Sequence, residues 1–280
     1  MAGGKMTLAK DSLREIILNI ADVALKIKCE GQPRSCRAFK KFTAERCLSV
    51  KDTWFLDSID INKKGSKKKL SRGAKSFFFD DPVRIDLENK RITRFHSSDT
   101  RQAPALNDRL ITYAYSQALS AEHGMLLHAA AVVKDKRAYL FLGSSGAGKS
   151  TAASLCAKYK IIGDDVVAVK RSGASYGVFP TPWKQAPFTK GAERSKAEIK
   201  AFFFIRKSSR VSFKPIPPEE ALKRMLYSHI HFLVLTRRPL LDDIFATASG
   251  FVRDIPAYDM EFTRDDDFWP ELEEAVDARR

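Results

Sequence analysis

Residues 138–151 read AYLFLGSSGAGKST. The first five are apolar and β-prone, the middle is rich in glycine, and the end continues into the helix-prone run 151–157. A strand, a glycine-rich loop and a helix in this order are the context in which the pattern G-x-x-x-x-G-K-[ST] binds phosphate. We therefore predict that the loop Gly143–Thr151 binds a nucleoside triphosphate.

The residue types of this loop suit the chemistry of a triphosphate. Glycine lets the backbone approach an anion closely, and the loop amides together with the helix N-terminus direct partial positive charge at it. We expect Lys149 to reach the β- and γ-phosphates and the Ser150 hydroxyl to ligate Mg²⁺. The predicted cofactors are ATP and Mg²⁺, and the predicted phosphate-binding residues are Gly143, Ser144, Ser145, Gly146, Ala147, Gly148, Lys149, Ser150 and Thr151.

Two adjacent acidic residues, Asp164 and Asp165, follow the loop at a distance that accommodates one short helix and a return to the sheet. They interrupt the apolar run 161–169, which predicts a buried strand. A nucleotide site needs a carboxylate near the metal, and transfer to a hydroxyl needs a base for its proton. Neighbouring residues of a strand point to opposite faces. We therefore assign one aspartate to Mg²⁺ and one to the acceptor hydroxyl, without choosing between them.

A histidine, His128, lies in the otherwise apolar segment 126–133, which predicts a strand. From the residues alone, a single histidine in such a strand is more often a core residue than a catalytic one.

The histidine, the loop and the aspartate pair together resemble the C-terminal kinase domain of HPr kinase/phosphorylase. The P-loop arrangement of that group also resembles phosphoenolpyruvate carboxykinase. The resemblance implies an α/β fold with a P-loop nucleotide-binding core of this type and ATP-dependent phosphorylation of a serine hydroxyl. It implies catalytic roles for Asp164, Asp165, Lys149 and His128, with metal contacts from Ser150, Asp164 and Asp165.

Two departures from that family bear on the acceptor. Ser144 stands where HPr kinases usually carry an acid, and the family's downstream Gly/Asn-rich signature is absent from the sequence. The acceptor we expect is therefore a serine-type hydroxyl of another protein, a peptide or a small molecule rather than HPr. The alternative function is a nucleotide-sensing regulatory or scaffold protein that binds ATP with little or no transfer. The resemblance also makes a homo-oligomer a reasonable expectation.

The chain divides into two predicted regions. Residues 1–100 form a β-rich N-terminal region of unknown role, with strands expected at 23–29 and 54–61 and a hairpin over 83–95. Residues 101–280 form the kinase domain. Its expected elements are helices over 104–121, 217–226 and from about 267, and strands at 125–133, 137–142 and 199–204.

Composition limits the class of protein. The chain has 280 residues, a formal charge of +15 and four cysteines without zinc-ligand spacing. Its apolar runs are shorter than the roughly 18–20 residues of a membrane span, and its N-terminus lacks a signal peptide's apolar core. We therefore expect a cytoplasmic protein with reduced thiols and no membrane partner.

Part of the positive charge is local. Seven basic residues and no acidic one lie between Lys63 and Lys75. No aromatic residue is interleaved for base stacking, so we interpret the stretch as a solvated loop and expect no nucleic acid. A docking patch for an acidic protein acceptor stays open. Weaker phosphate-site candidates are Lys184, Lys190, Arg237 and Arg238, and we expect no metal site at His229 and His231.

Overall fold

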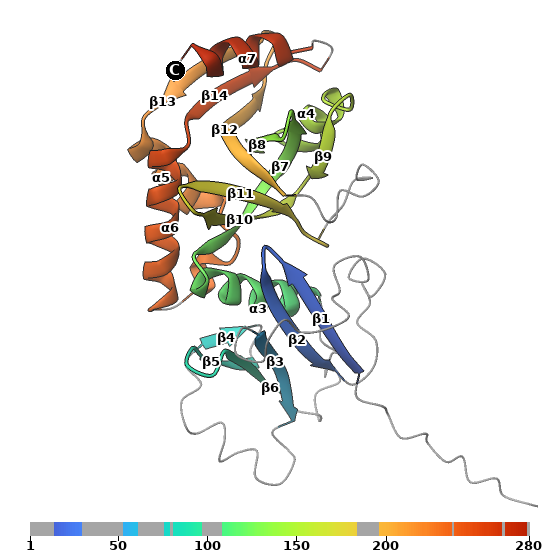
Figure 1. Ribbon diagram of the computed structural model, residues 1–280, viewed down its shortest axis with the longest axis vertical. Coiled ribbons are helices and arrows are strands. Elements are labelled where there is room, and N and C mark those ends of the chain that lie inside the picture. The colour runs from blue at the N-terminus through green and yellow to red at the C-terminus, as the bar shows by residue number, and fades with distance from the viewer. Residues whose placement is uncertain are drawn as a thin grey trace, which may run out of the picture.

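The computed structural model describes residues 14–29, 53–60, 76–78, 81–96, 108–183, 196–236, 238–264 and 267–278. This part contains two β-sheets and five α-helices, labelled α3 to α7. In Figure 1 the N-terminal sheet forms the lower part of the molecule and the larger sheet the upper part, with α3 between them. The basic stretch 63–75 and the candidates Lys184, Lys190 and Arg237 lie outside the described residues.

The N-terminal sheet has the strand order β1-β2-β3-β6-β5-β4. Its strands are β1 (Arg14–Ile20), β2 (Val23–Cys29), β3 (Thr53–Asp60), β4 (Ser76–Phe78), β5 (Asp81–Asp86) and β6 (Arg91–His96). The two predicted strands and the predicted hairpin are confirmed, because β5 pairs antiparallel with β6. The Asp86 carboxylate accepts a 3.0 Å hydrogen bond from the Asn89 amide at the turn, and this bond lowers the pKa of Asp86.

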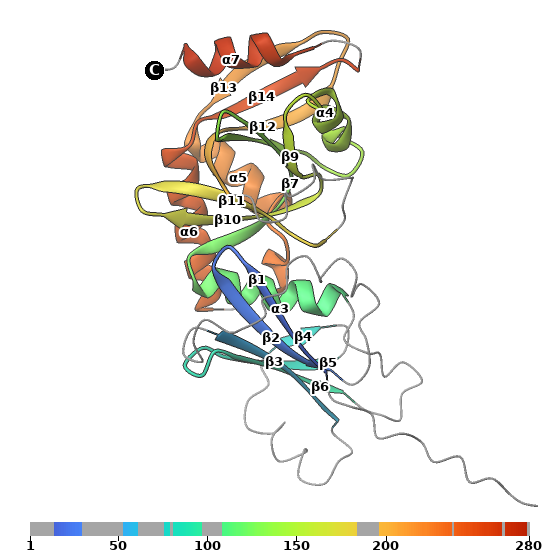
Figure 2. The same ribbon diagram turned by 45° about the vertical axis from the view of Figure 1, so that its right-hand side comes forward.

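Helix α3 (Asp108–Ala121) joins the two sheets through one apolar core. Leu110, Tyr113 and other buried side chains of α3 belong to the same cluster as Trp54 of the N-terminal sheet and Val166 of the larger one. Figure 2 shows α3 beneath the larger sheet and above the N-terminal one. Residues on both sides of position 100 share this core. The division of the chain into two regions at residue 100 therefore stays a prediction.

The larger sheet has the order β11-β10-β7-β8-β12-β14-β13, with β9 paired to β7 and a further pairing of β11 with β12. Its strands are β7 (Gly124–Lys134), β8 (Arg137–Leu142), β9 (Lys160–Gly163), β10 (Val166–Ser172), β11 (Ser175–Pro180), β12 (Ala197–Lys207), β13 (Ser212–Ile216) and β14 (Ala257–Phe262). The three strands β8, β12 and β14 run parallel, and the other pairings are antiparallel.

Helices cover both faces of this sheet, which makes the fold mixed α/β as predicted. Helices α5 (Pro218–Ser228) and α6 (Leu240–Asp254) pack on one face, while α4 (Lys149–Leu155) and α7 (Trp269–Asp277) pack on the other. Strand β8 shows why both faces of the sheet must be covered, because its side chains on both faces are apolar. Leu140 contributes to the core on the α5–α6 face and Phe141 to the core on the α4–α7 face, so neither surface of the strand faces water.

The predicted strand over 161–169 is divided in two, which corrects one expectation. Strands β9 and β10 each pair antiparallel with β7, and Asp164 and Asp165 form the bend between them. The argument that the two aspartates point to opposite faces of one regular strand therefore does not apply. The division has a physical cause, because two half-buried carboxyl groups are costly inside a fully covered strand.

Candidate functional site

The glycine-rich loop lies at the edge of the sheet where the parallel strands end. Strand β8 ends at Leu142 and leads into the loop, while β12 ends at Lys207 and β14 at Phe262. The Ser208 amide donates to the Phe262 carbonyl over 2.9 Å, which ties the ends of β12 and β14 together. The carboxyl edge of parallel strands is where open α/β sheets bind ligands.

Two glycines of the loop adopt conformations that other residues avoid. Gly146 has φ 83° and Gly148 has φ 107°. A Cβ at Gly148 would lie 2.7 Å from the Phe262 ring, whereas one at Gly146 would meet nothing within 4 Å. The Gly148 carbonyl then accepts the first helical hydrogen bond of α4, from Ala152 at 2.7 Å. Gly148 is therefore required by both its backbone angle and its packing.

Lys149, the lysine of the motif, is buried and folds back over the loop. Its Nζ donates to the Gly143 carbonyl at 2.9 Å and to the Ser144 carbonyl at 3.2 Å. The ammonium group is thus held at the start of the loop, where β8 ends. Ser144, Ser145 and Ser150 are exposed.

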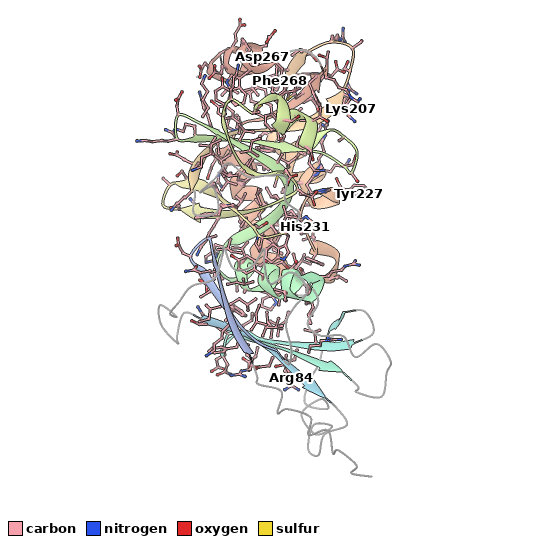
Figure 3. All side chains as sticks on the ribbon, turned by 90° about the vertical axis from the view of Figure 1, so that its right-hand side faces the viewer. Arg84, Lys207, Tyr227, His231, Asp267 and Phe268 are labelled. Carbon is pink, nitrogen blue, oxygen red and sulfur yellow. The ribbon has the colours of Figure 1, made fainter. Side chains whose placement is uncertain are left out.

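A second lysine, Lys207, reaches the same loop from the end of β12. Its Nζ donates to the Gly146 carbonyl over 3.1 Å, and it is exposed. Figure 3 labels Lys207 together with Tyr227 and His231 on the part of the molecule built on the larger sheet, while Arg84 lies on the other sheet. Lys207 was not predicted as a site residue, because the strand expected from the sequence ended at Phe204.

His128 and Asp165 form a pair across the sheet. The His128 Nε2 lies 2.7 Å from the Asp165 Oδ1, and the Asp165 carbonyl accepts a 3.0 Å hydrogen bond from the amide of Ala129. His128 is aligned with Val166 on β10, the residue that follows Asp165. The β-pairing therefore places the side chains of His128 and Asp165 next to each other. The histidine that the sequence left ambiguous is therefore a partner of one of the two candidate carboxylates.

Two further histidines lie beside β7, on the edge opposite β10. The segment after α5 forms a bridge between Ile230 and Leu127, in which the His128 amide donates to the His229 carbonyl over 2.8 Å. The ring centroids of His128 and His231 are 5.5 Å apart in an edge-on arrangement. This long-range pairing brings residues 229–231 to the candidate site, which no local sequence pattern indicates.

His229 is 6% exposed, and its ring packs at 5.3 Å against the ring of Phe204. Within the described residues, the His229 Nδ1 has no hydrogen-bond partner. Burial lowers the pKa of His229 to about 4, with smaller contributions from the positive charges of His128 and Lys149. The imidazole of His229 is therefore neutral at physiological pH.

A pocket of about 940 Å³ opens beside the start of the loop. Loop, strand and helix contribute to its lining, which includes Gly143, Ser144, Phe204, Lys223, Tyr227 and His229. Tyr227 of α5 stands at its rim with 91% of its surface exposed. An aromatic side chain left in solvent beside a pocket offers a contact surface to a ligand.

Ser150 and the two aspartates offer oxygen donors, the type of ligand that Mg²⁺ prefers. Among the described residues no group of three His, Cys, Asp or Glu side chains is arranged to hold a metal ion. Mg²⁺ ordinarily takes one or two carboxylates and completes its shell with substrate phosphates and water. The donor set of Ser150 with Asp164 or Asp165 is of that kind, so the residues present fit a metal that arrives with a nucleotide.

Arg238, a weaker phosphate-site candidate, and Cys156 each contact other groups of the chain. Arg238 is exposed and forms an ion pair with Asp242 over 3.5 Å, within one turn of chain. Cys156 is 2% exposed on the inner face of α4, and burial raises the pKa of its thiol to about 12. Cys156 therefore packs as a small apolar residue.

The comparisons with known proteins assign a family. A family model described as "SynChlorMet cassette protein ScmC" matches residues 98–277, more than half of the chain. The chain belongs to the ScmC family. The match to the ScmC family spans the larger sheet, its helices and α3, and therefore contains every candidate residue described above.

Among solved structures, the HPr(Ser) kinase/phosphatase from Coxiella burnetii is similar to this ScmC-family chain. The two are 15% identical, with 55% of this chain and 94% of that chain covered and a TM-score of 0.28. A sequence search of curated proteins returns no match. None of the described helices is long and apolar enough to cross a membrane.

Proposed function

We propose that the chain is an ATP-binding kinase that transfers the γ-phosphoryl group of ATP to a serine-type hydroxyl. The observation that carries the proposal is the position of Lys149 over the carbonyls of Gly143 and Ser144, at the carboxyl edge of the parallel strands. The lysine of such a loop contacts the β- and γ-phosphates. The γ-phosphate would then lie at the start of the loop.

The acceptor would approach from the pocket beside the loop. Gly143 and Ser144, whose carbonyls bind Lys149, also line that pocket. A hydroxyl group in the pocket would therefore face the γ-phosphate, as in-line transfer requires. A pocket of about 940 Å³ accommodates a small molecule or the side chain and flanking backbone of a peptide.

We assign acceptance of the hydroxyl proton to Asp165, held in place by His128. The 2.7 Å contact between the two side chains fixes the orientation of the carboxylate, which is what a general base needs. Asp164 is then the carboxylate that remains for the metal, together with Ser150. Bound Mg²⁺ would neutralise charge on the phosphate oxygens. Lys149 and the loop amides would hold the phosphates in line with the acceptor.

The proposal is tested with purified protein, γ-labelled ATP, Mg²⁺ and an extract that supplies acceptors. We expect label on a discrete hydroxyl, and we expect the Lys149→Met variant to lose it. Lys214→Met is the matched control, since Lys214 is an exposed lysine on β13. Tight ATP binding without transfer would favour the sensor or scaffold alternative, and absence of ATP binding would overturn both.

A further inference from the structure

We propose that Lys207 is a second phosphate-contacting residue, which reaches the nucleotide from the end of β12 and contacts a different part of the loop from the motif lysine. The inference rests on the proposed ATP-binding function and adds a residue that lies 57 positions beyond the motif, at the end of another strand.

Lys207 lies at the edge of the sheet that carries the loop. Strand β12 is the parallel neighbour of β8, with Phe204 aligned to Leu142, so both strands end at the same edge. Lys207 is the last residue of β12 and its ammonium group lies 3.1 Å from the Gly146 carbonyl, at the centre of the loop. Lys149 occupies the start of the loop instead. The two ammonium groups thus contact different parts of one loop.

The side chain of Lys207 packs close to Gly148 of the loop. A Cβ at Gly148 would lie 3.0 Å from the Lys207 Cε and 2.7 Å from the Phe262 ring. The aliphatic stem of Lys207 therefore passes directly over Gly148 and is held there against Phe262. A glycine at this position allows the stem to cross the loop, which places the charge where phosphates would lie.

Lys207 and its neighbour Arg206 differ in how their positive charges are balanced. Among the described residues no ion pair joins Lys207 to a carboxylate, whereas its neighbour Arg206 pairs with Glu261. Successive residues of a strand point to opposite faces. The charge of Arg206 is therefore neutralised by an acid, whereas the charge of Lys207 faces the loop. The present partner of Lys207 is a carbonyl oxygen, and a phosphate oxygen is a stronger acceptor for an ammonium group.

The test measures the Kd of Mg²⁺–ADP and Mg²⁺–ATP by calorimetry at 50 mM and 500 mM NaCl. We expect Lys207→Met to weaken both nucleotides about tenfold at the lower salt, the scale of one charge-assisted hydrogen bond at an exposed site. The loss should shrink at 500 mM NaCl because salt screens an exposed charge. Arg206→Met is the matched control and should change either Kd less than about twofold.

A second substitution separates charge from loop structure. Lys207→Gln keeps a polar N–H donor without the charge, so it should keep the loop and yet lose the same affinity as Lys207→Met, while Lys207→Arg should keep most of it. If Lys207→Gln binds ADP like the unmodified chain, or if Lys207→Met does, the inference is overturned. If the unmodified chain binds neither ADP nor ATP, the proposed function fails instead, which is a different result.

Discussion

The Nε2 of His128 and the Oδ1 of Asp165 are 2.7 Å apart although the two residues are 37 positions apart in the sequence. The contact exists because Asp165 lies in the bend between β9 and β10, both of which pair with β7. A carboxylate beside a fixed imidazole is restricted in orientation, so the pair is suited to receive one proton from one direction.

We predict that Asp165→Asn lowers the transfer rate by about 10²- to 10⁴-fold, the usual range for loss of a general base, while ADP affinity changes little. The measurement is single-turnover transfer of label from ATP, with ADP binding measured in parallel. Asp135→Asn is the control, since Asp135 lies in the β7–β8 turn at φ 47°, which asparagine also adopts.

A double variant tests whether the pair acts as a unit. His128→Ala combined with Asp165→Asn should be little slower than Asp165→Asn alone, because in the proposed mechanism His128 acts through the aspartate. Additive losses would show that His128 contacts the reacting groups independently.

We predict that His229 contributes to the change of protein stability with pH. Its folded-state pKa of about 4 lies below the ordinary value of 6.5. Between these values the unfolded chain binds more protons, so the free energy of unfolding falls as the pH drops from 6.5 towards 4. At about 1.36 kcal/mol per pKa unit the full loss is about 3 kcal/mol. Above pH 6.5 the residue contributes no pH dependence.

The check is urea unfolding of the unmodified chain and of His229→Phe between pH 4 and 8. Phenylalanine keeps the contact with Phe204 and removes the titration, so the variant should lose less stability on acidification. His123→Asn is the control, because His123 is exposed in a turn at φ 58° that asparagine tolerates. Equal acid sensitivity in His229→Phe and the unmodified chain would contradict the assignment.

Much of the fold was predictable because its signals are local. The strand before the loop and the helix after it are specified by adjacent residues, and the hairpin of β5 and β6 by its alternation and turn. Helix α6 also has a local signal, with Leu240, Ile244, Ala248 and Phe251 at helical spacing, although it was not predicted from the sequence. Strand β14 gives a weaker signal, because it is covered on both faces.

The site was less predictable because its contacts are long-range. The loop and the aspartates could be proposed from spacing, whereas the contact of His128 with Asp165 requires β9 and β10 to fold against β7. The position of His229 depends on one bridge between Ile230 and Leu127. Lys207 depends on how far β12 extends, and strand ends are the least certain part of a sequence-based assignment. The nucleotide, the metal and the acceptor stay predictions.

Substitutions of the two loop glycines should have different effects, because the surroundings of these glycines differ. Gly148→Ala would place a Cβ 2.7 Å from the Phe262 ring at φ 107°, so we expect loss of ATP binding and a stability cost above about 2 kcal/mol. Gly146→Ala at φ 83° meets no neighbour and should cost only about 1–2 kcal/mol. Gly173→Ala, in the β10–β11 turn at φ 65°, should cost a similar amount and leave ATP binding intact. Thermal unfolding and ATP calorimetry on the three variants give the comparison.

A substitution that fills the pocket beside the loop tests most directly whether the acceptor or the nucleotide binds there. Ser228 is exposed at the end of α5 and lines the pocket, so Ser228→Trp should fill it and abolish transfer to the acceptor found in the extract. Binding of ATP should persist, because Lys149 and the loop glycines are untouched. Lys214→Trp adds the same ring at an exposed position of β13 and should leave both measurements unchanged. If Ser228→Trp transfers label normally, the acceptor reaches the γ-phosphate by another route, and if it loses ATP binding as well, the pocket belongs to the nucleotide.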